Sequence, residues 1–234
     1  QSGTTLTLGT SGDTVVVPSG VSLAPGGGLT LTGALAVDGG TVKLDGNYPT
    51  GSNNVALGDG ALDDGSLSGN NNTAIGDDAL GENTSGGINT AIGGQSLRAN
   101  TTGVCNVGVG YATLFDNTTG LQNTAIGSYS LTNNTTANNN TAVGYNSLLQ
   151  NTTGTPNTAV GMCSLQANTT GGDNVAIGYR ALKLNTTTSS NVAVGVNVLA
   201  SNVASNNTAV GHSAMVANTT GTQNVAVGNE SLGS

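Results

Sequence analysis

A five-residue phrase with an apolar centre, Asn-Thr/Val-Ala-Ile/Val-Gly, recurs along most of the chain. Its asparagines are separated once by 18 residues, then seven times by 17, then by 16 and by 17. They are Asn54, Asn72, Asn89, Asn106, Asn123, Asn140, Asn157, Asn174, Asn191, Asn207 and Asn224. Such a regular period is the signature of a solenoid, in which each repeat forms one coil and stacked coils bury a shared core.

Two further positions of the repeat are nearly constant. Eight residues after the first asparagine comes a leucine, or once a methionine, and eleven residues after it most copies have a second asparagine. The leucines predicted to fill the core are Leu80, Leu97, Leu114, Leu131, Leu148, Leu165, Leu182 and Leu199. The second asparagine usually opens an Asn-Thr-Thr-Gly turn, because Asn and Gly tolerate left-handed backbone. Seventeen residues are enough for two short strands and two turns, and stacked asparagines should form ladders.

The third and fourth positions of the phrase point to opposite faces of its strand, because side chains alternate along a strand. Both positions are apolar in nearly every copy, so both faces should be covered. The second strand of the coil supplies one cover. We expect another chain to supply the other, because long exposed apolar strips are rare on monomers.

The fourth-position side chains should therefore meet at the axis of an oligomer, or else fill the core within each coil, with alanine on the opposite face. They are Ile75, Ile92, Val109, Ile126, Val143, Val160, Ile177, Val194, Val210 and Val227.

Residues 1–53 have a different pattern, with short alternating runs such as TLTLG, TVVVP and LTLTG between Gly, Pro and Asp. Period-two alternation bounded by turn residues predicts short strands. Each is too short to be stable alone. The chain is therefore predicted to be all-β, with an N-terminal β-rich stem or cap over 1–53 and about eleven coils of a parallel β-roll over 54–234.

Composition excludes several classes of function. Charged residues make up 7% of the chain, the net charge is −8, and four cations cannot neutralise a phosphate backbone, so nucleic-acid binding is not expected. No apolar run approaches the roughly 18 residues of a membrane span, so membrane insertion is not expected either. His212 is the only histidine, and no nucleophile, base and acid can be grouped around it. The chain is predicted not to be an enzyme.

Acidic side chains gather in the first two repeats. Asp59 and Asp77 occupy the same repeat position in adjacent coils, as do Asp64 and Glu82. Stacked carboxylates about 5 Å apart repel unless they are neutralised. Ca²⁺, which prefers oxygen ligands, is a candidate for that role. A solvated acidic rim is the favoured alternative, and no other cofactor is expected.

Tyr111, Tyr145 and Tyr179 recur every 34 residues, directly after the glycine of the phrase. They form either a row of receptor contacts suited to stacking on sugars or a cover over one corner of the roll. The Asn-Thr-Thr turns match the N-glycosylation acceptor, and their threonine pairs form regular ladders. Threonine arrays on a flat β-solenoid face would suit ice binding, which is a further alternative.

The NTAIG and NVAVG phrases, followed by a small residue and Leu, resemble the head repeats of trimeric autotransporter adhesins, which form a left-handed parallel β-roll of three chains. The resemblance covers residues 54–234, although the repeat is longer here than is usual in that family. The extra length fits an outward loop at the Asn-Thr-Thr-Gly turn. The N-terminal TLTLGTSGDTVVVPSG stretch is similar to predicted tail-fibre proteins of bacteriophages.

These resemblances imply a homotrimeric, structural and adhesive fibre segment on a virion or an extracellular surface. Foremost is a phage tail fibre that contacts a host cell-surface glycan or protein and joins other virion or fibre components. A bacterial trimeric surface adhesin head and an ice-binding β-solenoid are the alternatives.

Overall fold

The computed structural model describes residues 51–233, which form a β-solenoid without helices. The chain divides into two units, and every described residue belongs to the second, residues 44–234. The predicted stem over 1–53 lies outside the described residues except for its last three. The prediction of an all-β solenoid with coils of about 17 residues is confirmed.

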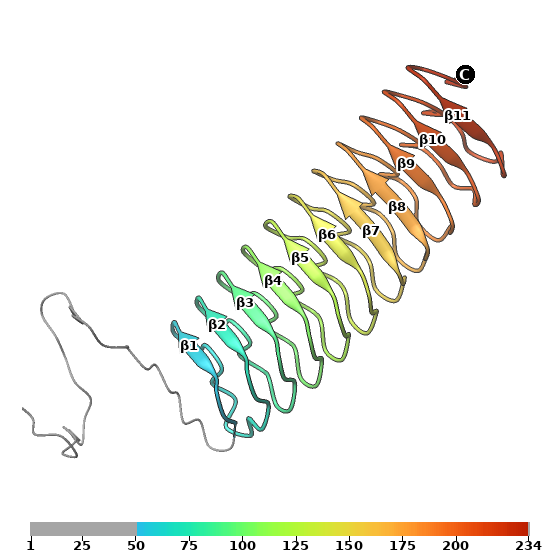
Figure 1. The fold of residues 1–234 in the computed structure, drawn as a ribbon. Helices are drawn as coiled ribbons and strands as arrows, with labels where there is room; N and C mark the ends of the chain where they lie inside the picture. Colours follow the sequence, from blue (N-terminus) through green and yellow to red (C-terminus); the bar gives the residue numbers. More distant parts are fainter. Residues whose placement is uncertain (1–50, 234) are drawn as a thin grey trace, which may run out of the picture. The chain divides into compact units, whose positions relative to one another are not determined.

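Each coil contributes one short strand to a single parallel sheet, in which strands adjacent in sequence are adjacent in space (Figure 1). The strands are β1 (Val55–Leu57), β2 (Thr73–Ile75), β3 (Thr90–Ile92), β4 (Val107–Val109), β5 (Thr124–Ile126), β6 (Thr141–Val143), β7 (Asn157–Val160), β8 (Asn174–Ile177), β9 (Val192–Val194), β10 (Thr208–Val210) and β11 (Val225–Val227). The register pairs like with like, as when Ala74 faces Ala91 and Ile75 faces Ile92. Every position of the repeat thus becomes a ladder along the solenoid.

We number coils 1 to 11 and count positions within a coil from the first asparagine of the phrase. Position 5 is then the glycine of the phrase, position 9 the leucine and position 12 the second asparagine. The first coil has one residue more than the usual 17, and the ninth has one fewer.

Positions 3 and 9 fill the interior of the solenoid with alanine and leucine. The position 9 leucines of coils 1 to 9 have no exposed surface: Leu62, Leu80, Leu97, Leu114, Leu131, Leu148, Leu165, Leu182 and Leu199. Met215 takes the same place in coil 10. Burying one such side chain contributes about 1.5–3 kcal/mol, and the repeat provides this contribution in coil after coil.

The segment that carries the leucine is not the second strand that the repeat length predicts. Positions 6–11 run through consecutive turns, and positions 7 and 9 have left-handed backbone, with φ of 60° at Tyr129 and 51° at Leu131 in coil 5. A left-handed residue interrupts an extended chain. The expectation of two strands per coil is therefore wrong, and each described coil has one.

The asparagine at position 1 fixes which face of the strand turns inward. The backbone N–H of Asn106 donates to Oδ1 of Asn89 at 2.9 Å, and Nδ2 of Asn106 donates to the carbonyl oxygen of Gly120 at 2.8 Å. Both asparagines are buried. Because side chains alternate, position 3 then also points inward, while positions 2 and 4 point outward.

The asparagine at position 12 forms a second buried ladder. Nδ2 of Asn117 donates to Oδ1 of Asn100 at 2.9 Å and to the carbonyl oxygen of Gly120 at 3.2 Å. That carbonyl is the one that the position 1 amide also reaches, so the two ladders are joined within the coil. The predicted asparagine ladders are confirmed, and their hydrogen bonds avoid the roughly 1–3 kcal/mol cost of an unsatisfied buried group.

The glycine at position 5 ends each strand and turns the chain. In coil 6, Gly144 has φ of 135°, and a Cβ there would lie 2.7 Å from the carbonyl carbon and oxygen of Gly161 in the next coil. Neither the backbone conformation nor the space permits a side chain. Position 6 therefore begins a new direction of the chain, at the rim of the sheet.

Candidate interaction surfaces

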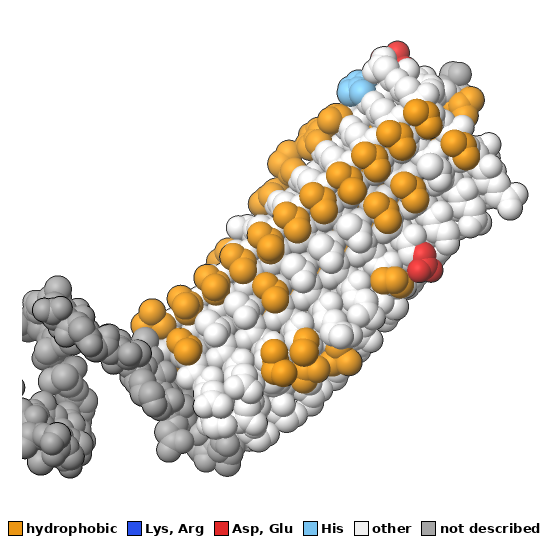
Figure 2. Space-filling view, viewed as in Figure 1, with side chains coloured by type: hydrophobic (Ala, Val, Ile, Leu, Met, Phe, Trp, Pro, Cys, Tyr) orange, Lys and Arg blue, Asp and Glu red, His pale blue; other side chains and the backbone are white. Residues whose placement is uncertain are grey.

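The outward face of the sheet carries an unbroken row of aliphatic side chains at position 4 (Figure 2). In the middle coils Ile92, Ile126 and Ile177 are 38%, 41% and 40% exposed. Threonine or valine at position 2 forms a parallel row beside them. The alternative that the position 4 side chains fill the core within each coil is wrong, because the inward place belongs to alanine.

A cluster of three tyrosines lies at the rim of this face, at positions 6 and 7 of coils 4, 5 and 6. The ring centroids of Tyr111 and Tyr129 are 5.5 Å apart, and those of Tyr129 and Tyr145 are 6.0 Å apart. Both contacts are edge-to-face, with interplanar angles of 78° and 85°. The hydroxyl of Tyr111 also donates to Oε1 of Gln95 at 3.0 Å.

The structure changes the membership of the predicted tyrosine row. Tyr179 stands apart from the cluster, with the guanidinium of Arg180 4.8 Å from its ring centroid. Tyr129 joins the cluster although the 34-residue spacing does not include it. It stands at position 7 rather than 6, and a search for identical repeat positions cannot find a contact made across neighbouring positions.

A second apolar patch lies at the opposite rim of the sheet, at positions 16 and 17 of coils 2 to 4. It consists of Ile88, Val104, Cys105 and Leu121, where later coils mostly have polar residues. A shallow hollow of about 330 Å³ borders it. Ile88 is 61% exposed and has left-handed backbone, with φ of 59°, which is strained for a β-branched residue.

The acidic cluster is partly neutralised by a cation from the neighbouring coil. Nη1 of Arg98 is 3.3 Å from Oε1 of Glu82, and Nε of Arg98 is 3.5 Å from Oδ2 of Asp78. Hydrogen bonds from the hydroxyl and the backbone N–H of Ser66 lower the pKa of the Asp64 carboxyl below its usual value. Two of the four candidate calcium ligands therefore already have protein partners.

The other two candidate ligands, Asp59 and Asp77, are exposed. Within residues 51–233, no three His, Cys, Asp or Glu side chains are placed to hold a metal ion. Calcium binding stays a prediction. His212 is exposed at the rim of coil 10, and Cys105 and Cys163 are free thiols.

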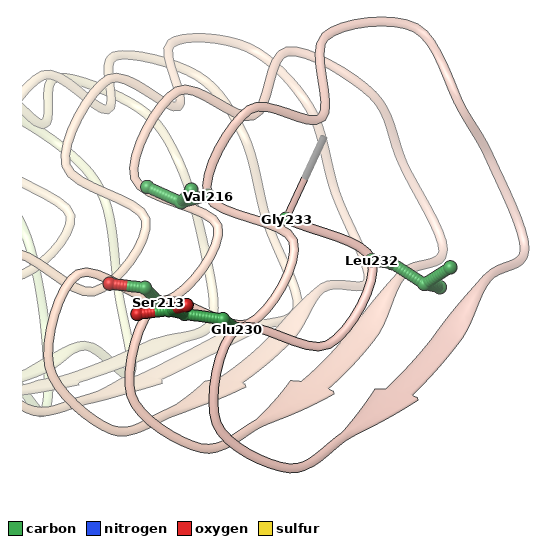
Figure 3. Close-up of a pocket in the computed structure, with 5 residues that line it drawn as sticks. All are labelled: Ser213, Val216, Glu230, Leu232 and Gly233. Atoms are coloured by element: carbon green, nitrogen blue, oxygen red, sulfur yellow. The ribbon is translucent and has the colours of Figure 1, made fainter.

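A hollow of about 680 Å³ lies at the last described coil, lined by Ser213, Val216, Glu230, Leu232 and Gly233 (Figure 3). Leu232 occupies position 9 yet is 60% exposed, whereas the same position is buried in coils 1 to 10. In those coils the next coil covers it. The hollow thus reflects the end of the stack of described coils, and we assign it no function.

The Asn-Thr-Thr loops expose fewer of their side chains to solvent than their sequence suggests. The asparagines of seven glycosylation acceptor sequences have no exposed surface: Asn83, Asn100, Asn117, Asn134, Asn151, Asn168 and Asn185. The hydroxyl of Thr118 at position 13 donates to the carbonyl oxygen of Thr135 in the next coil at 3.1 Å, whereas Thr119 at position 14 is exposed. In coils 3 to 7 the loops therefore show one exposed threonine each, at position 14, whereas both threonines are exposed in coils 8 and 10.

These features define the chain as a repeat protein with one apolar sheet face. One rim of that face carries the tyrosine cluster, and the opposite rim carries the second apolar patch. Comparison with protein-family models, with curated proteins and with solved structures gave no significant match. Residues 51–233 include no helix with the length and apolarity needed to cross a membrane.

Proposed function

We propose that the chain is a segment of a homotrimeric adhesive fibre whose three solenoids pack side by side through the outward faces of their sheets. The observation that supports this is the continuous position 4 ladder, which points away from an interior that alanine and leucine already fill. A contiguous apolar strip that runs the length of a molecule marks an interaction surface.

The geometry of the strip favours parallel copies of the same chain. Because every coil has an aliphatic residue at position 4, a second copy in register would place aliphatic side chains against aliphatic side chains along the whole length. Closed rotational symmetry then buries the strip without leaving an open end for further growth. The resemblance to trimeric adhesin heads supports three copies.

The expected role is to hold contact surfaces at a fixed distance and in several copies. Eleven strands about 4.8 Å apart form a rod about 50 Å long. Three identical rods would present each surface site three times, which raises the effective concentration for weak contacts with a host surface. Such a segment belongs on a virion, for example in a tail fibre, or on a bacterial cell surface.

The test is the native mass of the purified chain by light scattering. We expect three times 22.6 kDa. Replacing Ile126 with Asp should abolish the trimer, because it places three charges near one axis. Thr136→Asp, an exposed change at position 14 of the same coil, is the matched control and should leave the mass unchanged.

A monomeric wild-type chain would overturn the proposal. The sheet face, with its regular rows at positions 2 and 4, would then be free for another flat partner. Ice binding would be tested next, as thermal hysteresis.

A further inference from the structure

The tyrosine cluster has the physical features of a binding platform. Tyr111, Tyr129 and Tyr145 are 46%, 37% and 50% exposed, yet each touches a neighbouring ring edge-to-face. The hydrogen bond from Tyr111 to Gln95 fixes one ring further. Tyrosine offers a large amphipathic surface with few rotatable bonds, so a cluster held in this way loses little entropy when a ligand binds.

The two rim positions around the cluster are uncharged. Positions 6 and 7 carry no charged residue from coil 3 to coil 7. Hydroxyl and amide side chains stand at the same two positions, in Gln95, Ser128 and Asn146. Charged residues at these positions occur before the cluster, as Asp77 and Asp78, and after it, as Arg180.

We propose that Tyr111, Tyr129 and Tyr145, together with Gln95, bind a neutral glycan chain that lies along the solenoid. Aromatic faces stack on the C–H faces of pyranose rings, while uncharged hydroxyl and amide groups hydrogen-bond to sugar hydroxyls. Because the three tyrosines follow one another along successive coils, the ligand is an extended chain of several sugars rather than a single residue.

Other ligand classes fit these residues less well. A sulfated, sialylated or phosphorylated ligand would need cations, and positions 6 and 7 of these coils have none. The inference rests on the proposed attachment role, for which it names the class of ligand. The cluster lies beyond the corner glycine, at the rim, and is distinct from the position 4 ladder that the trimer requires.

The experiment measures binding of the full chain to a printed array of neutral and acidic glycans, followed by dissociation constants for the neutral oligosaccharides retained. The variants use residues that the repeat itself places at the same position. Tyr129→Asn follows Asn146 at position 7, where asparagine accepts the left-handed backbone, and Tyr145→Ser follows Ser128 at position 6. Val196→Ser is the matched control, an exposed apolar residue at position 6 outside the cluster.

We expect binding to extended neutral glycans, weakened about tenfold by Tyr129→Asn or Tyr145→Ser, with Val196→Ser equal to wild type. Retention of no neutral glycan, retention of acidic glycans alone, or unchanged binding by both tyrosine variants would overturn the proposal. So would a change in native mass caused by the tyrosine variants, because the cluster would then be an interface between copies.

The native mass separates this proposal from the fibre proposal. A monomer that binds neutral glycans through the tyrosines refutes the trimer and supports the platform. A trimer that Ile126→Asp dissociates but that binds no neutral glycan supports the fibre and refutes the platform.

Discussion

Two groups of positions in the same repeat behave in opposite ways. Positions 1, 3, 9 and 12 point into the solenoid and carry almost the same residue in every coil, whereas position 6 at the rim carries Asp77, Gly94, Tyr111, Met162 and His212 in different coils. Both groups lie within a few residues of each other in the sequence. The nearly constant positions hold the residues that define the fold, and the variable position holds the residues that make one coil different from another.

The interior is uniform because each side chain contacts its own copies above and below. In a solenoid, stability is a sum of coil terms and interface terms between neighbours, so a change at one ladder position weakens two interfaces. A rim side chain has no such constraint, since one of its sides faces solvent. Rim residues can therefore differ from coil to coil without weakening the fold, and their identity can instead follow the needs of ligand binding.

The largest loss of stability that would test this contrast is expected from a charge in the asparagine ladder at position 12. Nδ2 of Asn134 donates to Oδ1 of Asn117 at 2.8 Å and to the carbonyl oxygen of Ala137 at 3.1 Å, and its Oδ1 accepts from Nδ2 of Asn151 at 3.0 Å. Asn134→Asp removes both donors and buries a carboxylate against two acceptors. We expect a loss of about 3 kcal/mol or more in the free energy of unfolding, measured by chemical denaturation.

The neighbouring residue provides the control for that experiment. Asn133 is exposed in the same coil, so Asn133→Asp makes the same chemical change outside the ladder and should alter stability by less than about 0.5 kcal/mol. Equal effects of the two substitutions would show that the ladder does not hold the coils together.

Much of the interior could be predicted from the sequence, because stacked coils need the same residue at the same position of each repeat, and this need appears in the sequence as a fixed period. The strand at each phrase, the buried leucines and the asparagine ladders all follow from residues that recur at fixed spacing. Alternation alone left open which of positions 3 and 4 turns inward. The hydrogen bonds of the asparagine at position 1 decide this, and they depend on the next coil, for example on Asn123 accepting the backbone N–H of Asn140 at 3.0 Å.

The sequence was less informative where a position has a special backbone or a partner in another coil. Left-handed backbone at Leu131 could not be foreseen, because leucine ordinarily avoids it and is held there by burial. The contact of Tyr129 with two tyrosines and the pairing of Arg98 with Glu82 join different repeat positions. Periodicity relates only like positions, so it does not reveal such contacts.

A substitution at the rim, Ile88→Asn, should have a smaller effect than Asn134→Asp and should stabilise the protein rather than destabilise it. Ile88 has left-handed backbone and is 61% exposed, whereas Asn71 and Asn139 stand at the ends of their coils with the same conformation. Ile88→Asn should raise the free energy of unfolding by about 1 kcal/mol, because a β-branched residue is strained there and asparagine is not. Urea unfolding at a fixed protein concentration would measure it.

Val104→Asn is the control for Ile88→Asn. It changes a neighbouring apolar residue of the same patch that lacks left-handed backbone. If both substitutions stabilise the protein equally, exposure of apolar surface rather than backbone strain is the cause. If Ile88→Asn destabilises it, Ile88 makes contacts that outweigh its strain.

The smallest effect is expected at the acidic rim of coil 1, where Asp64 accepts hydrogen bonds from the hydroxyl and backbone N–H of Ser66. These bonds lower the pKa of Asp64 in the folded state below its usual value of 3.8, so the unfolded chain binds the proton more readily. The contribution to stability is thus fully present above that value and is lost as the pH falls through the lower, folded pKa. Asp64→Asn should flatten the acid limb of the stability curve, measured as melting temperature between about pH 2 and pH 5. Asp63→Asn removes the same charge from the adjacent exposed residue, and if it flattens the acid limb as much, the cause is net charge rather than the Ser66 hydrogen bonds.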